Sequence, residues 1–117
     1  MSVWKEQLGS DIWLIGISGR LDQSQTTDLE DSLQNLLIES HIQLLMDLSE
    51  VTYVNSGGLR CLVTIWRQAR DRGGNVVLCN LSERISQVFI VVGFDKVFEI
   101  YPSRAKALES LAGDQTS

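Results

Sequence analysis

The sequence contains few of the residues from which metal centres and disulfide frameworks are built. Its 117 residues include two cysteines, Cys61 and Cys79, a single histidine, His41, and a single proline. The cysteines lie among apolar neighbours in a predicted helix and a predicted strand, so with one histidine they do not form a zinc-ligand set. We therefore predict no metal and no cofactor. Two cysteines without a disulfide pattern also fit a reducing compartment, and we expect the protein in the cytoplasm.

Positive charge is also scarce. The sequence has ten lysines and arginines and fifteen aspartates and glutamates, which gives a formal net charge of −5. Nucleic-acid binding needs a basic patch that neutralises phosphates, so the charge balance argues against nucleic acid and favours a basic protein as partner. No apolar run approaches the roughly 20 residues of a membrane span, and no basic segment leads into an apolar run at the N-terminus. We expect no direct membrane insertion.

Hydrophobic periodicity predicts an α/β fold in which strands alternate with helices. Strands are predicted at 3–8, 12–18, 42–48, 75–81 and 97–101, and helices at 24–39, after residue 56, after Ser82 and after Ser103. The first two strands resemble a hairpin, whereas each later strand follows a helix, which favours parallel pairing with right-handed crossovers. The prediction is a mixed β-sheet with parallel core strands and about four packed helices. A single domain over residues 1–112 and a flexible tail over 113–117 are expected.

The most informative segment runs from Asp47 to Arg60, where a buried strand, a loop and a helix start follow one another. We interpret Asp47 as mostly structural, with loop amides as its partners. The first turn of the helix carries Ser56, Gly57 and Gly58. Unpaired amides at a helix start favour negative charge, so a phosphate on Ser56 would be stabilised there. Serine before a helix is also a common N-cap, and both interpretations stay open on these residues alone.

Three segments of the chain resemble STAS domains of the anti-sigma factor antagonist type. The similar residues are Asp47-Leu48-Ser49, Tyr53-Val54, Ser56, Gly58 and Leu59 in the first segment, Ser18-Gly19-Arg20-Leu21-Asp22 in the second, and Gly93-Phe94-Asp95-Lys96-Val97-Phe98 in the third. They occur in family order, and the resemblance covers roughly residues 3 to 112. It implies a bacterial regulatory protein and not an enzyme. In this family the serine at the position of Ser56 is phosphorylated by a partner protein kinase.

The resemblance further implies how the protein acts. The unphosphorylated form would bind an anti-sigma factor that has serine kinase activity, phosphorylation would break the complex, and a serine phosphatase would reset it. The implied partner-binding residues are Asp22, Asn55, Ser56, Gly57, Gly58 and Arg60. Loops that follow parallel strands gather at one edge of a sheet, so the Asp22 and Ser56 loops are expected side by side. Asp22 fits a helix N-cap equally well.

Two positions differ from the family pattern. Asn55 replaces the usual aspartate, which retunes phosphorylation if a kinase uses that carboxylate and changes little if the position only caps the loop. Gly57 replaces a second hydroxyl residue and is expected to make the helix start more flexible. Because of these differences a second hypothesis stays open beside the switch, in which the chain is a constitutive STAS scaffold subunit of a transporter or of a stress-sensing complex.

A serine hydrolase is the enzyme that this segment resembles superficially, because the nucleophile elbow also joins a strand, a serine and a helix. That motif requires glycine two residues before the serine, where this chain has Val54. The single histidine, His41, precedes Ser56, opposite to the hydrolase order. We therefore predict no catalytic residues.

Overall fold

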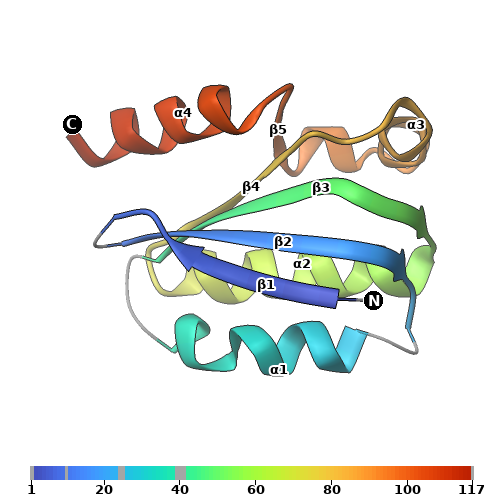
Figure 1. Ribbon diagram of the computed structural model, residues 1–117, viewed down its shortest axis with the longest axis horizontal. Coiled ribbons are helices and arrows are strands. Elements are labelled where there is room, and N and C mark those ends of the chain that lie inside the picture. The colour runs from blue at the N-terminus through green and yellow to red at the C-terminus, as the bar shows by residue number, and fades with distance from the viewer. Residues whose placement is uncertain (1, 10, 24–25, 39–41, 117) are drawn as a thin grey trace.

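Five strands form one mixed sheet in the part of the chain that the structure describes (Figure 1). The computed structural model describes residues 2–9, 11–23, 26–38 and 42–116. The strands are β1 Ser2–Gln7, β2 Ile12–Leu21, β3 Gln43–Val54, β4 Asn75–Cys79 and β5 Glu99–Tyr101, in the spatial order β1-β2-β3-β4-β5. The β1 strand is antiparallel to β2, and the other neighbouring pairs are parallel. The predicted mixed sheet with parallel core strands is confirmed.

The helices are α1 Thr26–Leu37, α2 Ser56–Asp71, α3 Glu83–Val91 and α4 Arg104–Thr116, with a short 3-10 helix, η1, at Phe94–Lys96. Capping residues in the sequence correctly predicted where α3 begins and ends. Ser82 Oγ accepts from the Ile85 amide at 3.2 Å, and Gly93, with φ 79°, follows α3 as predicted. The α4 helix continues through Thr116, into the segment that the sequence assigned to a tail. Ser24, the predicted first residue of α1, lies outside the described residues.

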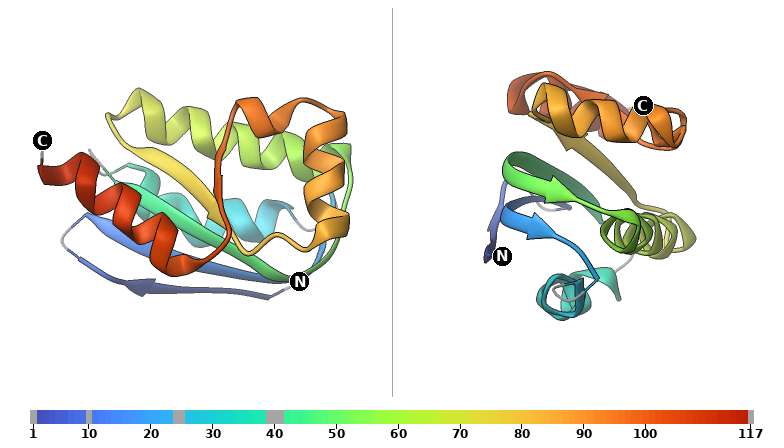
Figure 2. Two further views of the ribbon diagram at one scale, coloured as in Figure 1. Left: turned by 90° about the horizontal axis from the view of Figure 1, so that it is seen from above. Right: turned by 90° about the vertical axis from the view of Figure 1, so that its right-hand side faces the viewer.

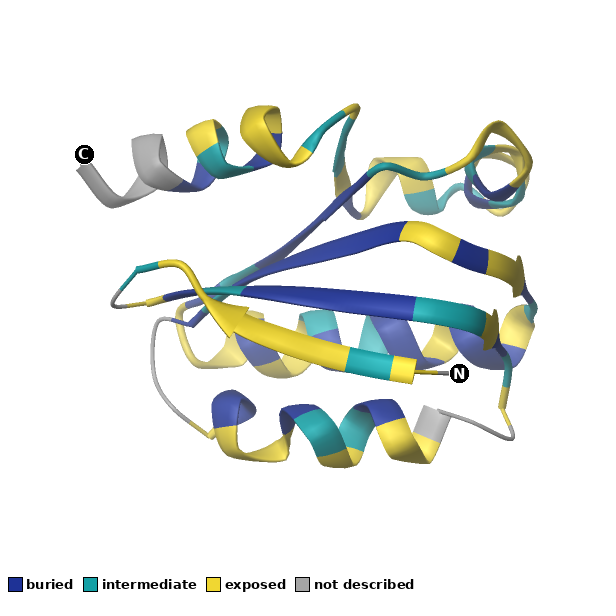
Figure 3. Cartoon of the chain, in the orientation of Figure 1, coloured by how far each residue is buried: buried dark blue, intermediate teal, exposed yellow. Residues whose placement is uncertain are grey.

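The central strands β2, β3 and β4 are buried along much of their length (Figure 3), and their apolar residues belong to two cores, one on each face of the sheet. One face of β2 and β3 packs with α1 and α2, through residues that include Ile15, Ile17, Leu44, Met46 and Leu48. Ile85 and Phe89 of α3 belong to the same core. The opposite face contacts Ala107 and Leu111 of α4 through Ile12, Leu14, Leu45, Val77 and Cys79. The sheet therefore lies between α1 and α2 on one side and α4 on the other (Figure 2).

The β3 strand is longer than the sequence predicted, and this extension positions the candidate site. Residues 49–52 were expected to form a loop, and that prediction is wrong because β3 continues to Val54. The register with β2 shifts twice, between Gly16 and Ser18 and between Gly19 and Arg20 of β2. These irregularities let β3 accommodate extra residues while it stays paired. The extension carries the Ser56 turn to the end of β2.

Candidate functional site at the start of α2

The Asp22 loop and the Ser56 turn meet at the carboxyl edge of the sheet, as predicted. Val54, the last residue of β3, pairs with Leu21, the last residue of β2. The Asn55 amide then donates to the Leu21 carbonyl at 3.3 Å. This short connection fixes the first turn of α2 beside the turn that follows β2.

Asn55, and not Ser56, caps α2. The Asn55 backbone is extended, with φ −122° and ψ −175°, and its Oδ1 atom accepts from the Gly58 amide at 3.0 Å. Satisfying an amide of the first turn is the function of an N-cap residue. The interpretation of Ser56 as the cap is therefore wrong, and Asn55 provides the cap in its place. Ser56 is the first residue of the helix and its side chain is exposed.

The glycine pair packs against the turn after β2. Gly57 and Gly58 are both buried. A Cβ atom at Gly58 would overlap the backbone carbonyl of Leu21, and a Cβ atom at Gly57 would lie 2.6 Å from Cβ of Gln23. The absent side chains thus permit the close approach of two loops, which a sequence pattern alone does not reveal.

Arg20 and Tyr53 extend the site along the sheet and were missed by the sequence analysis. These residues pair across β2 and β3, and the Arg20 guanidinium carbon lies 4.0 Å from the centroid of the Tyr53 ring. Arg20 Nε also lies 3.5 Å from Oδ2 of Asp22, whose side chain is only 16 % exposed. Asp22 is therefore held beside a cation. The signal that identifies this group is the register of β2 with β3, which depends on the bulges in β3.

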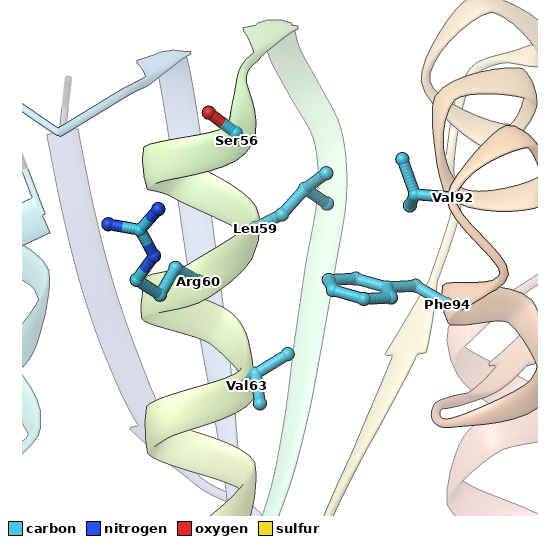
Figure 4. Close-up of a pocket in the computed structure, with 6 residues that line it drawn as sticks. All are labelled: Ser56, Leu59, Arg60, Val63, Val92 and Phe94. Atoms are coloured by element: carbon cyan, nitrogen blue, oxygen red, sulfur yellow. The ribbon is translucent and has the colours of Figure 1, made fainter.

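A largely apolar groove of about 290 Å³ opens between α2 and the segment that connects α3 to η1 (Figure 4). Leu59 and Val63 of α2 face Val92 and Phe94 across it. Ser56 and Arg60 complete the lining from the α2 side. Neighbouring parts of the sheet edge thus present a hydroxyl, a guanidinium and an apolar depression together.

Asp47 lies on the α4 face of the sheet and has a structural role, as the sequence predicted. Its carboxylate accepts from the Ser49 amide at 2.9 Å and from Asn80 Nδ2 at 3.3 Å, and it forms an ion pair with Arg104. Burial alone would raise the pKa of Asp47, but these hydrogen bonds more than offset it and hold the pKa below its usual value of 3.8. The partner Arg104, at the start of α4, was not foreseen because it is distant in sequence.

Comparison with known proteins agrees with this architecture. A family model described as the STAS domain matches residues 6–107. Anti-sigma-B factor antagonists are 30 % identical over 86 residues, in Listeria monocytogenes over 74 % of this chain and 75 % of the relative, and in Bacillus subtilis over 74 % and 78 %. The structure of the anti-sigma factor antagonist SpoIIAA in its unphosphorylated form superimposes with a TM-score of 0.80 at 15 % identity, over 96 % of this chain and 97 % of that one.

The chain therefore belongs to the STAS domain family, and its curated relatives are anti-sigma factor antagonists. The resemblance inferred from the three short segments is confirmed. Among the described residues, no helix has the length and apolar character needed to cross a membrane. His41, to which no chemistry was assigned, lies outside the residues that the structure describes.

Proposed function

We propose that the protein is a phosphorylation-controlled binding protein, which binds an anti-sigma factor with serine kinase activity while Ser56 is unphosphorylated. The observation that carries the proposal is the division of roles at the start of α2. Asn55 supplies the cap, so the Ser56 hydroxyl is exposed at the first helical position and is not needed to hold the helix. The anti-sigma factor antagonists related to this chain support the class of partner.

Phosphorylation would act through local charge. A phosphoserine adds roughly −1.5 to −2 charges and a tightly held hydration shell. The first turn of α2 has unpaired amides that tolerate this charge, so the domain stays folded. A partner surface packed against Ser56 would have to remove the water bound to the phosphate, and any acidic group on that surface would be repelled by it. Both effects weaken binding without refolding the antagonist.

The other predicted contact residues have two kinds of role in this proposal. Asn55, Gly57 and Gly58 shape the turn, whereas Asp22 and Arg60 offer charge to the partner. A serine phosphatase restores the binding form, and the protein itself performs no catalysis. The switch operates in the cytoplasm, within a single domain.

The test compares the affinities of Ser56→Ala and Ser56→Asp for the purified anti-sigma factor by isothermal titration calorimetry. We expect Ser56→Ala to bind like the wild type and Ser56→Asp to bind at least about tenfold more weakly, a difference of about 1.4 kcal/mol. Gln34→Asp adds a charge at an exposed residue of α1 and is the control, which is expected to bind normally. Equal affinity of both Ser56 variants would reject the switch and favour a constitutive scaffold.

A further inference from the structure

The groove beside Ser56 continues into an exposed apolar surface. Ile90, Val91 and Val92, at the end of α3, are 50 %, 81 % and 48 % exposed, and Val97, just after η1, is 38 % exposed. Soluble domains rarely gather so many exposed apolar side chains without a binding role. Much of this surface lies outside the depression, so a small molecule in the groove would leave it uncovered. A protein partner is large enough to cover both.

Arg60 contributes to the α2 wall of the groove, next to the serine. Arg60 lies four residues after Ser56 on α2, so the two side chains are neighbours on the helix surface. Figure 4 shows both polar groups on the side of α2 that faces away from Val92 and Phe94. In the part of the chain that the structure describes, the two ion pairs are Arg20–Asp22 and Asp47–Arg104, and neither uses Arg60.

We propose that the groove formed by Leu59, Val63, Val92 and Phe94 receives an apolar side chain of the anti-sigma factor, and that Arg60 pairs with a carboxylate next to that side chain. This inference rests on the proposed function, since it names the contact through which the Ser56 edge holds its partner. The groove is continuous with Ser56, which supports this occupant over a second copy of the chain. A buried apolar side chain beside an ion pair is a common anchor of protein interfaces.

A phosphate on Ser56 would also affect the contact made by Arg60. A phosphate on Ser56 would lie one helical turn from Arg60 and would compete with the partner's carboxylate for the guanidinium. Binding would then lose the Arg60 contact in addition to meeting the new charge. Ser56→Asp should therefore weaken binding by a smaller factor in an Arg60→Gln background than in the wild type.

The experiment measures the affinity of the purified anti-sigma factor for groove variants of the full chain. Val92→Gln places an amide in the groove, and Val63→Phe fills it. Each is expected to lower affinity about tenfold, as is Arg60→Gln. Ile38→Gln, a polar change at an exposed aliphatic residue of the α1 end, is the matched control and should bind normally. Urea unfolding confirms that each variant is folded.

The possible results separate the two proposals. Normal binding by Val92→Gln and Val63→Phe, together with weak binding by Ser56→Asp, would overturn the groove inference and leave the switch intact. Equal binding by Ser56→Ala and Ser56→Asp would reject the switch, while a loss with Val92→Gln would still assign the groove to the partner. Analytical ultracentrifugation of the purified chain without its partner tests whether a second copy occupies the groove. Self-association that Val92→Gln abolishes would assign the groove to a second copy and contradict the proposal.

Discussion

Asn55 and Ser56 are adjacent residues with separate tasks. The Asn55 side chain accepts from the Gly58 amide in the first turn of α2, and Ser56 is exposed to solvent. Aspartate has the same side-chain oxygen in the same place, so the departure of Asn55 from the family pattern preserves the cap. The cap of this turn thus depends on residue 55, whereas residue 56 is exposed beside it.

This separation predicts how substitutions at residue 55 affect stability. Asn55→Ala should lower the free energy of unfolding by about 1 kcal/mol, because the Gly58 amide loses its acceptor. Asn55→Asp should retain wild-type stability, and Ser56→Ala should change it by less than about 0.5 kcal/mol. Urea denaturation measures all three. A loss in Ser56→Ala as large as that in Asn55→Ala would mean that serine contributes to the cap after all.

Asp47 predicts a dependence of stability on pH. Its pKa is below 3.8 in the folded protein, so its ionised form stabilises the fold at higher pH. That contribution is complete above the unfolded value near 3.8 and is lost as the pH falls through the lower folded pKa. Asp47→Asn should cost about 1–3 kcal/mol at pH 7, because Arg104 and Asn80 lose a charged acceptor.

Urea unfolding of the wild type and Asp47→Asn at pH 7 and at pH 3 or lower checks the sign. The difference in unfolding free energy between the two proteins should shrink in acid, because the wild-type carboxylate becomes protonated. The Arg104 side chain is half exposed, so solvent screens its ion pair with Asp47. We therefore expect this ion pair to contribute only a small part of the stability lost in Asp47→Asn. A difference that grows in acid would contradict the assigned hydrogen bonds.

At the scale of elements, the start of α2 requires the end of β2 to be very close. Gly58→Ala should lower the free energy of unfolding by about 1–3 kcal/mol, because the new methyl group meets the rigid Leu21 carbonyl. Gly9→Ala is the control, since a Cβ atom there meets Ile12 side-chain atoms only at 4.0 Å. Thermal unfolding of both variants tests this contact. Comparable stabilities would show that the two loops can separate without cost.

Elements whose signals are local could be predicted from the sequence. The caps at Ser82 and Ser103 depend on residues three positions away, and both hydrogen bonds are present at 3.2 Å. The end of β3 could not be predicted, because residues 49–52 become strand only through a bulged register with β2. The groove was missed for a related reason. Val63 and Val92 are far apart in sequence, and only the folded chain places them on opposite sides of one groove.

At the scale of the whole molecule, the described residues form two separate apolar cores, and each has one cysteine. Cys61 lies in the core beneath α1 and α2, and Cys79 lies in the core beneath α4. Burial, with smaller effects of Glu30 on Cys61 and Asp47 on Cys79, raises the pKa of each thiol to about 12. Thiol reactivity therefore reports whether the two layers open together or separately.

Ellman's reagent at pH 8 should label neither thiol rapidly in the native protein and both after unfolding. If the domain opens as one unit, the two cysteines should react at the same slow rate. The Ser56→Asp variant should give the same rates, because the added charge lies outside both cores. Fast labelling of Cys79 alone would show that α4 detaches independently of the Ser56 edge.

The switch at Ser56 is tested most directly by phosphopeptide mass spectrometry of the protein recovered from its own cells, during growth and under stress. We expect phosphate on the peptide that contains Ser56, with an occupancy that changes between the two conditions. An unmodified peptide, detected well in both conditions, would contradict the switch. The exposed hydroxyl at the start of α2 would then belong to a constitutive binding surface.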